Sequence, residues 1–153
     1  MMKMVIKMLK DVLKKEYIRV DEEALDWKEA VRKANLPLLE HKCIKESYID
    51  GTIEMVKQLG PYIVICPGIA IAHARPEAGV LKNSISLITL KKPVRFGHSM
   101  NDPVKLVFTL AAKSNEGHLS ALSDLALVLG DESKYDRIMK ASTVDELYDC
   151  LIS

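Results

Sequence analysis

Apolar side chains recur at helical spacing through most of the first sixty residues. In the first twenty they fall every three or four positions, with lysines between them, which predicts a helix that packs on the domain. The apolar positions of this helix are Val5, Met8, Leu9, Val12 and Leu13. A helix lying on a membrane surface would show the same pattern and is the alternative interpretation.

Two more helices are predicted before residue 61. The acidic run 21–23 offers an N-cap and negative charge at the start of the second helix, and Pro37 is predicted to end it. The apolar stripe of the second helix consists of Leu25, Trp27, Ala30, Val31 and Ala34. Ser47 is the predicted N-cap of the third helix, which Gly60 and Pro61 terminate. The inward-facing residues of the third helix are Ile49, Ile53, Val56 and Leu59.

The middle of the chain changes to short runs rich in β-branched residues. Tyr62–Cys66 and Ile69–Ile71 predict two short strands with a Pro-Gly break between them. Ser84–Leu90 and Val104–Ala112 predict two longer strands. The last of these is almost continuously apolar, which is typical of a strand buried in the centre of a sheet.

The final third is predicted to be helical. One helix runs from about Gly117 to Gly130, and Ser133–Lys140 predicts a short second one. The apolar side of the longer helix carries Leu119, Leu122, Leu125, Ala126 and Leu129. Thr143 and Glu146 have the spacing of a capping box at the start of a last helix. The core residues of this last helix are Leu147 and Leu151.

Together these elements predict an α/β fold. We expect a three-layer sandwich in which helices flank a mixed β-sheet, forming a single domain over residues 1–153. Mixed strand directions are expected because the helices are not inserted regularly between the strands. No internal repeat or low-complexity linker divides the chain.

Composition narrows the function classes. The chain is 48% hydrophobic and 28% charged with a net charge of +1, which is typical of a soluble protein and disfavours a nucleic-acid binder. Its three cysteines form no CxxC pair, so we expect neither a disulfide framework nor a zinc site. No stretch approaches the roughly 20 apolar residues that span a bilayer, and no signal peptide is recognisable. A cytoplasmic protein without direct membrane insertion is expected.

His73 is the first candidate for chemistry. It leaves a predicted buried strand, lies between the small residues Ala72 and Ala74, and is followed by Arg75. Little side-chain bulk would block access to its imidazole, which suits a group that must meet a large partner. Taken alone, a histidine at a strand end is more often structural than functional.

His118 is the second candidate. It lies in the first turn of the helix that follows the long buried strand, where unpaired backbone N–H groups and the helix dipole favour a bound anion. The same field disfavours a protonated imidazole, so a neutral His118 would donate a hydrogen bond to phosphate. Taken alone, a capping or surface histidine is the commoner case.

Other reactive residue types are predicted to be uninvolved. His41 and His98 have no recognisable metal-ligand spacing. Both are expected on the surface or in loops. Cys66 lies close to His73 in the chain, but its apolar flanks favour a buried, inert thiol over a Cys–His pair. No P-loop or kinase motif is present, so we expect no ATP, no other cofactor and no metal.

Four motifs follow one another between Trp27 and Leu129. They are Gly60-Pro61-Tyr62-Ile63-Val64, the segment from Pro67 to Glu77 that contains His73, Asn101-Asp102-Pro103-Val104, and His118-Leu119 at the start of a leucine-rich helix. In order and spacing, across about two thirds of the chain, they resemble the IIA domain family of the mannitol, fructose and ascorbate phosphotransferase systems. The ascorbate branch is the most similar.

The resemblance implies a specific function. In that family, the histidine matched by His73 accepts phosphate from the carrier protein HPr and passes it to a cysteine of the IIB component. A second histidine, matched by His118, assists the phosphoryl group. An upstream basic residue in some members is matched in position by Lys57, and Arg75 is a candidate for binding phosphate or an acidic partner surface. The IIC membrane permease would be an indirect partner, and a homo-oligomer stays open.

One departure from the family pattern concerns the residue before His73. The family usually has proline there, whereas this chain has Ala72, which leaves the backbone less constrained and adds an N–H group. Two alternatives therefore stay open. One is a IIA-like regulatory protein without a transport role, and the other is an α/β domain whose histidines bind a metal or a small molecule.

Overall fold

A mixed five-stranded sheet runs through the middle of the molecule. The computed structural model describes residues 9–152, in which the strand order is β1-β4-β5-β3-β2. The strands are β1 (Leu13–Glu22), β2 (Val64–Cys66), β3 (Ile69–Ala72), β4 (Ser84–Val94) and β5 (Val104–Ala111). The β1–β4 and β3–β5 pairs are parallel, and the β4–β5 and β2–β3 pairs are antiparallel. The predicted mixed sheet is therefore confirmed.

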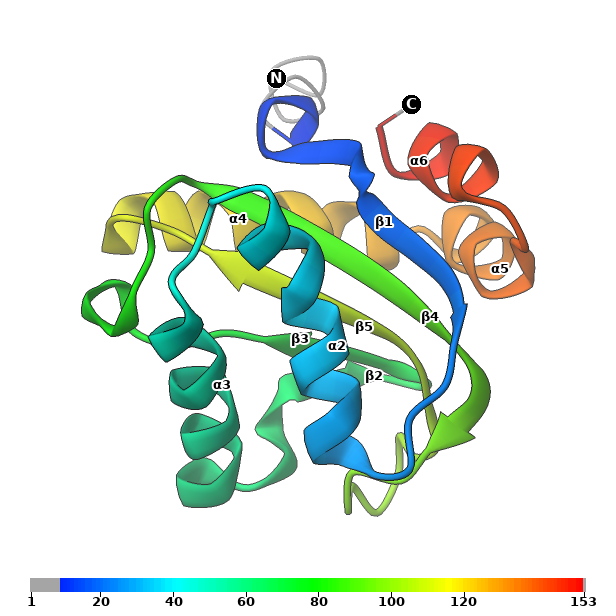
Figure 1. Cartoon of the computed structure of the whole chain (residues 1–153). Coiled ribbons are helices and arrows are strands. Elements are labelled where there is room, and N and C mark those ends of the chain that lie inside the picture. The colour runs from blue at the N-terminus through cyan, green and yellow to red at the C-terminus, as the bar shows by residue number, and fades with distance from the viewer. Residues whose placement is uncertain (1–8, 153) are drawn as a thin grey trace.

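Helices cover both faces of the sheet, which completes the predicted three-layer sandwich (Figure 1). One face carries α2 (Trp27–Glu40) and α3 (Glu46–Leu59). The other carries α4 (Asn115–Leu129), α5 (Glu132–Lys140) and α6 (Val144–Ile152). Two short 3₁₀ turns, η1 (Pro61–Ile63) and η2 (Pro76–Ala78), flank strands β2 and β3. No helix within residues 9–152 is long and apolar enough to cross a membrane.

The strands alternate between two hydrophobic cores. In β3, Ala70 and Ala72 face α2 and α3, whereas Ile69 and Ile71 face the core beneath α4. All four side chains are buried. Because successive side chains of a strand point to opposite faces, a strand covered on both sides is apolar at every position, as the sequence of β3 is.

The amino-terminal helix ends earlier than predicted. Residues 9–12 are helical, but Leu13–Glu22 forms strand β1, an element that the sequence interpretation missed. Val5 and Met8 of the predicted helix lie outside the described residues. Tyr17 packs in the core under α2 and Ile18 in the opposite core, so β1 is also buried on both faces. Parallel pairing with β4 decides its conformation, and that pairing leaves no local signal in the sequence.

The predicted limits of α2 are wrong at both ends. The acidic run 21–23 closes β1 and continues beyond it, and Asp26 caps α2 by accepting the Glu29 amide at 2.9 Å. Leu25 precedes the helix and is 92% exposed instead of buried. Pro37 lies inside α2, which continues to Glu40 and closes on the Pro37 carbonyl. An interior proline loses its amide hydrogen bond and crowds the carbonyl four residues earlier, yet α2 continues for about one further turn after Pro37.

The other helices and strands differ from the prediction in where some of them begin or end and in which side chains are buried. Ser47 does not cap α3, since its hydroxyl donates to the carbonyl of Ala78 at 2.6 Å. Tyr62 belongs to the 3₁₀ turn η1, so β2 begins only at Val64. Some residues predicted to face the core are exposed: Leu59, Leu119 and Ala126. The capping pair of α6 is present, because the Thr143 hydroxyl accepts the Glu146 amide at 3.1 Å.

Candidate functional site

His73 is the first residue beyond the end of β3. The last paired residue of the strand is Ala72, which is completely buried and lies opposite Thr109 of β5. The parallel ladder therefore extends to the residue before the histidine, with alanine in place of the proline that the family pattern leads one to expect. His73 itself is half-buried.

His118 reaches the same edge of the sheet from the neighbouring strand. Chain segment 112–114 leads from the end of β5 into α4, whose N-cap Ser114 accepts the Gly117 amide at 3.0 Å. Because β3 and β5 are parallel, their carboxyl ends meet at one edge. The segment after β3 and the first turns of α4 after β5 therefore lie next to each other.

The two imidazoles are in contact. Their ring centroids are 5.0 Å apart, with 55° between the ring planes. They share a small pocket of about 140 Å³. Its other lining residues come from α3 (Met55), from the segment after β3 (Ala74, Arg75 and Pro76), and from the β5–α4 junction (Ala112 and Asn115). Arg75 is exposed.

The surroundings favour a neutral His118 and one tautomer of His73. Burial lowers the pKa of His118, and the nearby His73 lowers it further. The Nδ1 atom of His73 lies 3.3 Å from the carbonyl oxygen of Ile71, so the hydrogen-bonding arrangement favours the tautomer that carries its proton on Nδ1. This tautomer leaves the lone pair of His73 on Nε2, where it can act as a nucleophile.

The first turn of α4 makes the pocket favourable to anions. Its Gly117 amide is bound by the Ser114 hydroxyl, and the His118 amide donates to the Ser114 carbonyl at 3.0 Å. Within residues 9–152, no partner is found for the amides of Asn115 and Glu116. Free amides at the positive end of a helix dipole bind phosphate well.

Sequence reasoning missed a buried tyrosine beneath the pocket. Tyr48 of α3 is fully buried, and its Oη accepts the amide of Ala74 at 3.0 Å. The same oxygen lies 2.6 Å from the carbonyl of Leu110, to which it donates. The available signal was a polar-tipped aromatic residue one position before the apolar stripe of the third predicted helix. Met55 and Asn115, which also line the pocket, carried no distinctive signal.

Lys57 is the predicted site residue that the structure does not bring to the pocket. It is exposed in the last turn of α3 and is not among the residues that line the cavity. His41 is exposed, and its Nδ1 lies 2.8 Å from the Pro37 carbonyl. His98 lies in a loop, as expected, where its Nδ1 accepts the amides of Met100 and Asn101. In the described part of the chain, no group of three or more metal-ligating side chains could hold a metal.

Cys66 is less buried than predicted. It is half-buried at the end of β2, whereas Cys43 and Cys150 are buried, and all three are free thiols. Burial raises the pKa of Cys66 nonetheless. A raised pKa keeps the thiol protonated and disfavours reactivity.

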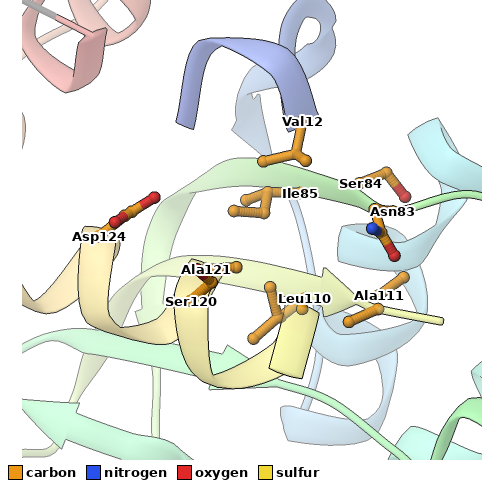
Figure 2. A pocket seen from close by; sticks show the side chains of 11 residues that line it. Val12, Asn83, Ser84, Ile85, Leu110, Ala111, Ser120, Ala121 and Asp124 are labelled. Carbon is orange, nitrogen blue, oxygen red and sulfur yellow. The ribbon is translucent and has the colours of Figure 1, made fainter. Parts of the chain in front are cut away.

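A second cavity lies beneath α4 on its core side (Figure 2). Its volume is about 80 Å³, and Val12, Ile85 and Leu110 give it an apolar wall. Asp124 of α4 also lines it, and burial raises the pKa of this carboxyl group. The cavity lies between part of α4 and the sheet, and neither His73 nor His118 lines it.

Comparison with known proteins gives consistent matches over nearly the whole chain. Residues 11–153 match the family described as phosphoenolpyruvate-dependent sugar phosphotransferase system, EIIA 2. The ascorbate-specific PTS system EIIA component of Escherichia coli K12 is 38% identical over 135 residues, which cover 88% of each chain.

Two solved structures from Escherichia coli share the fold. The solution structure of the mannitol-specific cryptic phosphotransferase enzyme IIA CmtB has a TM-score of 0.85 and 33% identity, covering 94% of this chain and 97% of that one. The complex of enzyme IIA and phosphorylated enzyme IIB for mannitol has a TM-score of 0.80 and 28% identity, covering 92% of this chain and 98% of that one.

Proposed function

Because the chain belongs to the EIIA 2 family of the phosphoenolpyruvate-dependent sugar phosphotransferase system, we propose that it relays a phosphoryl group through His73. EIIA components are phosphotransferase relay proteins, so the chain is a phosphotransferase. The proposed donor is phosphorylated HPr, and the proposed acceptor is a cysteine of a cognate IIB component. The observation that supports this relay best is the contact between His73 and His118 around one pocket.

The acceptance step needs one nucleophilic nitrogen. The Nε2 lone pair of His73 attacks the phosphorus of the donor phosphohistidine, and the bond from phosphorus to the donor nitrogen breaks. The bonding electrons return to the donor imidazole, while the Nδ1 proton of His73 stays near the Ile71 carbonyl. The reaction exchanges one N–P bond for another, so no net proton transfer is required. Positioning and charge stabilisation supply most of the catalysis in such a transfer.

The remaining pocket groups bind the phosphoryl oxygens. Before transfer, burial and the nearby His73 lower the pKa of His118, and the neutral ring donates an N–H hydrogen bond to an oxygen of the transferring group. The amides of Asn115 and Glu116, for which no partner is found within residues 9–152, offer further donors at the positive end of α4. Arg75, exposed beside the pocket, pairs with phosphate or with an acidic partner surface. Lys57 does not line the pocket, so we assign it no contact with the phosphoryl group.

The partners follow from the same proposal. The solved complex of a mannitol IIA with a phosphorylated IIB supports a IIB protein as the acceptor. The IIC permease would then be only an indirect partner, connected to this chain through IIB. Ascorbate is the proposed transported substrate, because curated relatives with 38% identity are named ascorbate-specific. We place this activity in the cytoplasm and treat residues 1–153 as one EIIA domain.

Radiolabelled phosphoenolpyruvate, together with the two general phosphotransferase proteins, tests the relay directly. We expect one acid-labile phosphoryl group on the wild-type chain and none on His73→Ala, because the nucleophilic nitrogen is lost. Adding the candidate IIB protein should then transfer the label to its cysteine. Undiminished labelling of His73→Ala would overturn the site assignment.

The same assay separates the two alternatives. A regulatory relative would accept the label from HPr and fail to pass it to any IIB cysteine. A metal-binding domain would ignore phosphorylated HPr and retain a stoichiometric amount of metal, which elemental analysis of the purified chain would detect.

A further inference from the structure

A single buried hydroxyl joins three elements beneath the site. Tyr48 lies in the first turn of α3, and its Oη accepts the amide of Ala74 at 3.0 Å while donating to the carbonyl of Leu110 at 2.6 Å. Ala74 follows His73 directly, and Leu110 lies near the end of β5, the strand that leads to α4. The hydroxyl therefore connects the backbone next to His73, and the strand that leads to the helix of His118, to the same helix.

The contact with Ala74 also determines which amides can bind phosphate. The Ala74 amide is adjacent to His73, but its proton is already donated to Tyr48. Both partners are buried, so breaking the bond would leave a desolvated donor without a partner. The phosphoryl oxygens must therefore be bound by other donors, such as His118 and the first turn of α4.

The segment after His73 has little freedom to move away from α3. A methyl group added at Gly51 would come within 2.9 Å of the Ala78 Cβ and 3.3 Å of the Ala74 Cβ, so the helix and this segment are in close contact. The Ser47 hydroxyl donates to the Ala78 carbonyl at 2.6 Å, and the Lys45 amide donates to the Gly79 carbonyl at 2.8 Å. Among these hydrogen bonds, the one from the Ala74 amide to Tyr48 involves the residue nearest in sequence to His73.

Tyr48 stays a neutral phenol throughout. Burial raises its pKa to about 12, so it neither loses a proton nor carries charge at neutral pH. Its hydroxyl is occupied by backbone groups and does not line the pocket. An effect on transfer must therefore pass through the position of the backbone that carries His73.

We infer that Tyr48 is a positioning residue for phosphoryl transfer at His73, holding the Ala74 peptide so that His73 Nε2 is directed into the pocket beside His118. This inference rests on the proposed function. It predicts that the Ala74 amide remains bound to Tyr48 before and after phosphorylation and never binds the phosphoryl group.

The test compares two buried tyrosines. Tyr48→Phe removes the hydroxyl beneath the site, and Tyr17→Phe removes a hydroxyl that contacts Cys43 Sγ at 3.4 Å in the same core. Transfer from phosphorylated HPr is measured over a range of HPr concentrations. We expect kcat to fall about 10- to 100-fold in Tyr48→Phe with KM for HPr unchanged, because a misplaced nucleophile is slowed after docking. Tyr17→Phe should stay within about twofold of the wild type.

Nuclear magnetic resonance of the histidine rings gives a readout that stability alone does not move. Folded Tyr48→Phe should show a smaller fraction of the Nδ1–H tautomer of His73, whereas Tyr17→Phe should match the wild type. A normal kcat in folded Tyr48→Phe, an equal fall in both variants, or a change in KM alone would each overturn the inference.

Two further outcomes are distinguishable. If the wild-type chain accepts no phosphate from HPr, the proposed function fails, and the tautomer comparison still tests the positioning of His73. If Tyr48→Phe does not fold, the wild-type Ala74 amide provides the test. Its proton resonance should change little on phosphorylation, and a large downfield shift would show that it binds the phosphoryl group and would overturn the inference.

Discussion

Opposite ends of β5 each place a histidine among backbone amides, yet the loop at one end binds its own amides, whereas at the other end no partner is found within residues 9–152 for two of them. At the amino end, the loop before β5 contains His98 and Asp102. The Asp102 carboxylate accepts the amides of Phe96, Gly97 and His98, and His98 Nδ1 accepts two more amides of the same loop. The side chains of this loop therefore bind the loop's own backbone.

At the carboxyl end the bonding is incomplete. His73 and His118 face each other, and no partner within residues 9–152 is found for the first two amides of α4. Only the supporting groups are saturated: Tyr48 binds Ala74, and Ser114 binds Gly117. The difference shows that a histidine becomes a candidate for chemistry when its neighbours leave donors for a ligand, and becomes structural when the loop uses them itself.

His118→Ala would test the carboxyl end of β5, and we expect it to have the largest effect. We expect transfer from HPr to His73 to slow about 100-fold, which corresponds to about 2.7 kcal/mol, because one donor to the transferring oxygens is lost. The protein should remain folded, since His118 is only half-buried. Rapid-quench measurement of label on His73 checks this, with His98→Ala as the matched control. Equal rates in wild type and His118→Ala in both directions of transfer would show that His118 is a bystander.

Asp102→Ala would test the amino end of β5, where the side chains of the loop bind the loop's own amides. Three backbone amides lose their charged acceptor, so we expect the free energy of unfolding to fall by about 2 kcal/mol. Phosphorylation of His73 in the folded fraction should be unchanged, because the loop lies at the other end of β5. Urea denaturation and the labelling assay measure the two quantities separately. A slowed transfer with unchanged stability would contradict the distinction between the two ends.

The pH dependence of stability gives the smallest predicted effect. The pKa of His118 is lowered in the folded protein below its ordinary value of 6.5, so the unfolded chain binds more protons as pH falls below that value. Stability should therefore decrease on acidification from about pH 6.5. Urea midpoints between pH 7 and pH 5 measure the decrease. In His118→Gln this part of the slope should disappear, and an identical slope in both proteins would refute the assignment.

Local patterns predicted most elements but not their partners. The periodicity of α3, the apolar runs of β3 and β5 and the capping pair of α6 were recognisable because each reflects burial of one element. Strand β1 was missed, since its apolar spacing also fits a helix and its conformation depends on pairing with β4. Lys57 was predicted to bind phosphate from sequence correspondence alone. It lies in the last turn of α3 and does not line the pocket, whereas Arg75 does.

The sequence by itself determined that His73 follows a buried strand in a segment of small residues. It also determined that His118 lies at the start of a helix that follows a second buried strand. Only the tertiary structure decided that the two rings lie 5.0 Å apart and that Tyr48 binds the backbone at Ala74 and Leu110. The physical reason is range. Propensity and periodicity act over a few neighbouring residues, whereas the site depends on parallel pairing of β3 with β5 and on a hydroxyl from α3, which are contacts between distant parts of the chain.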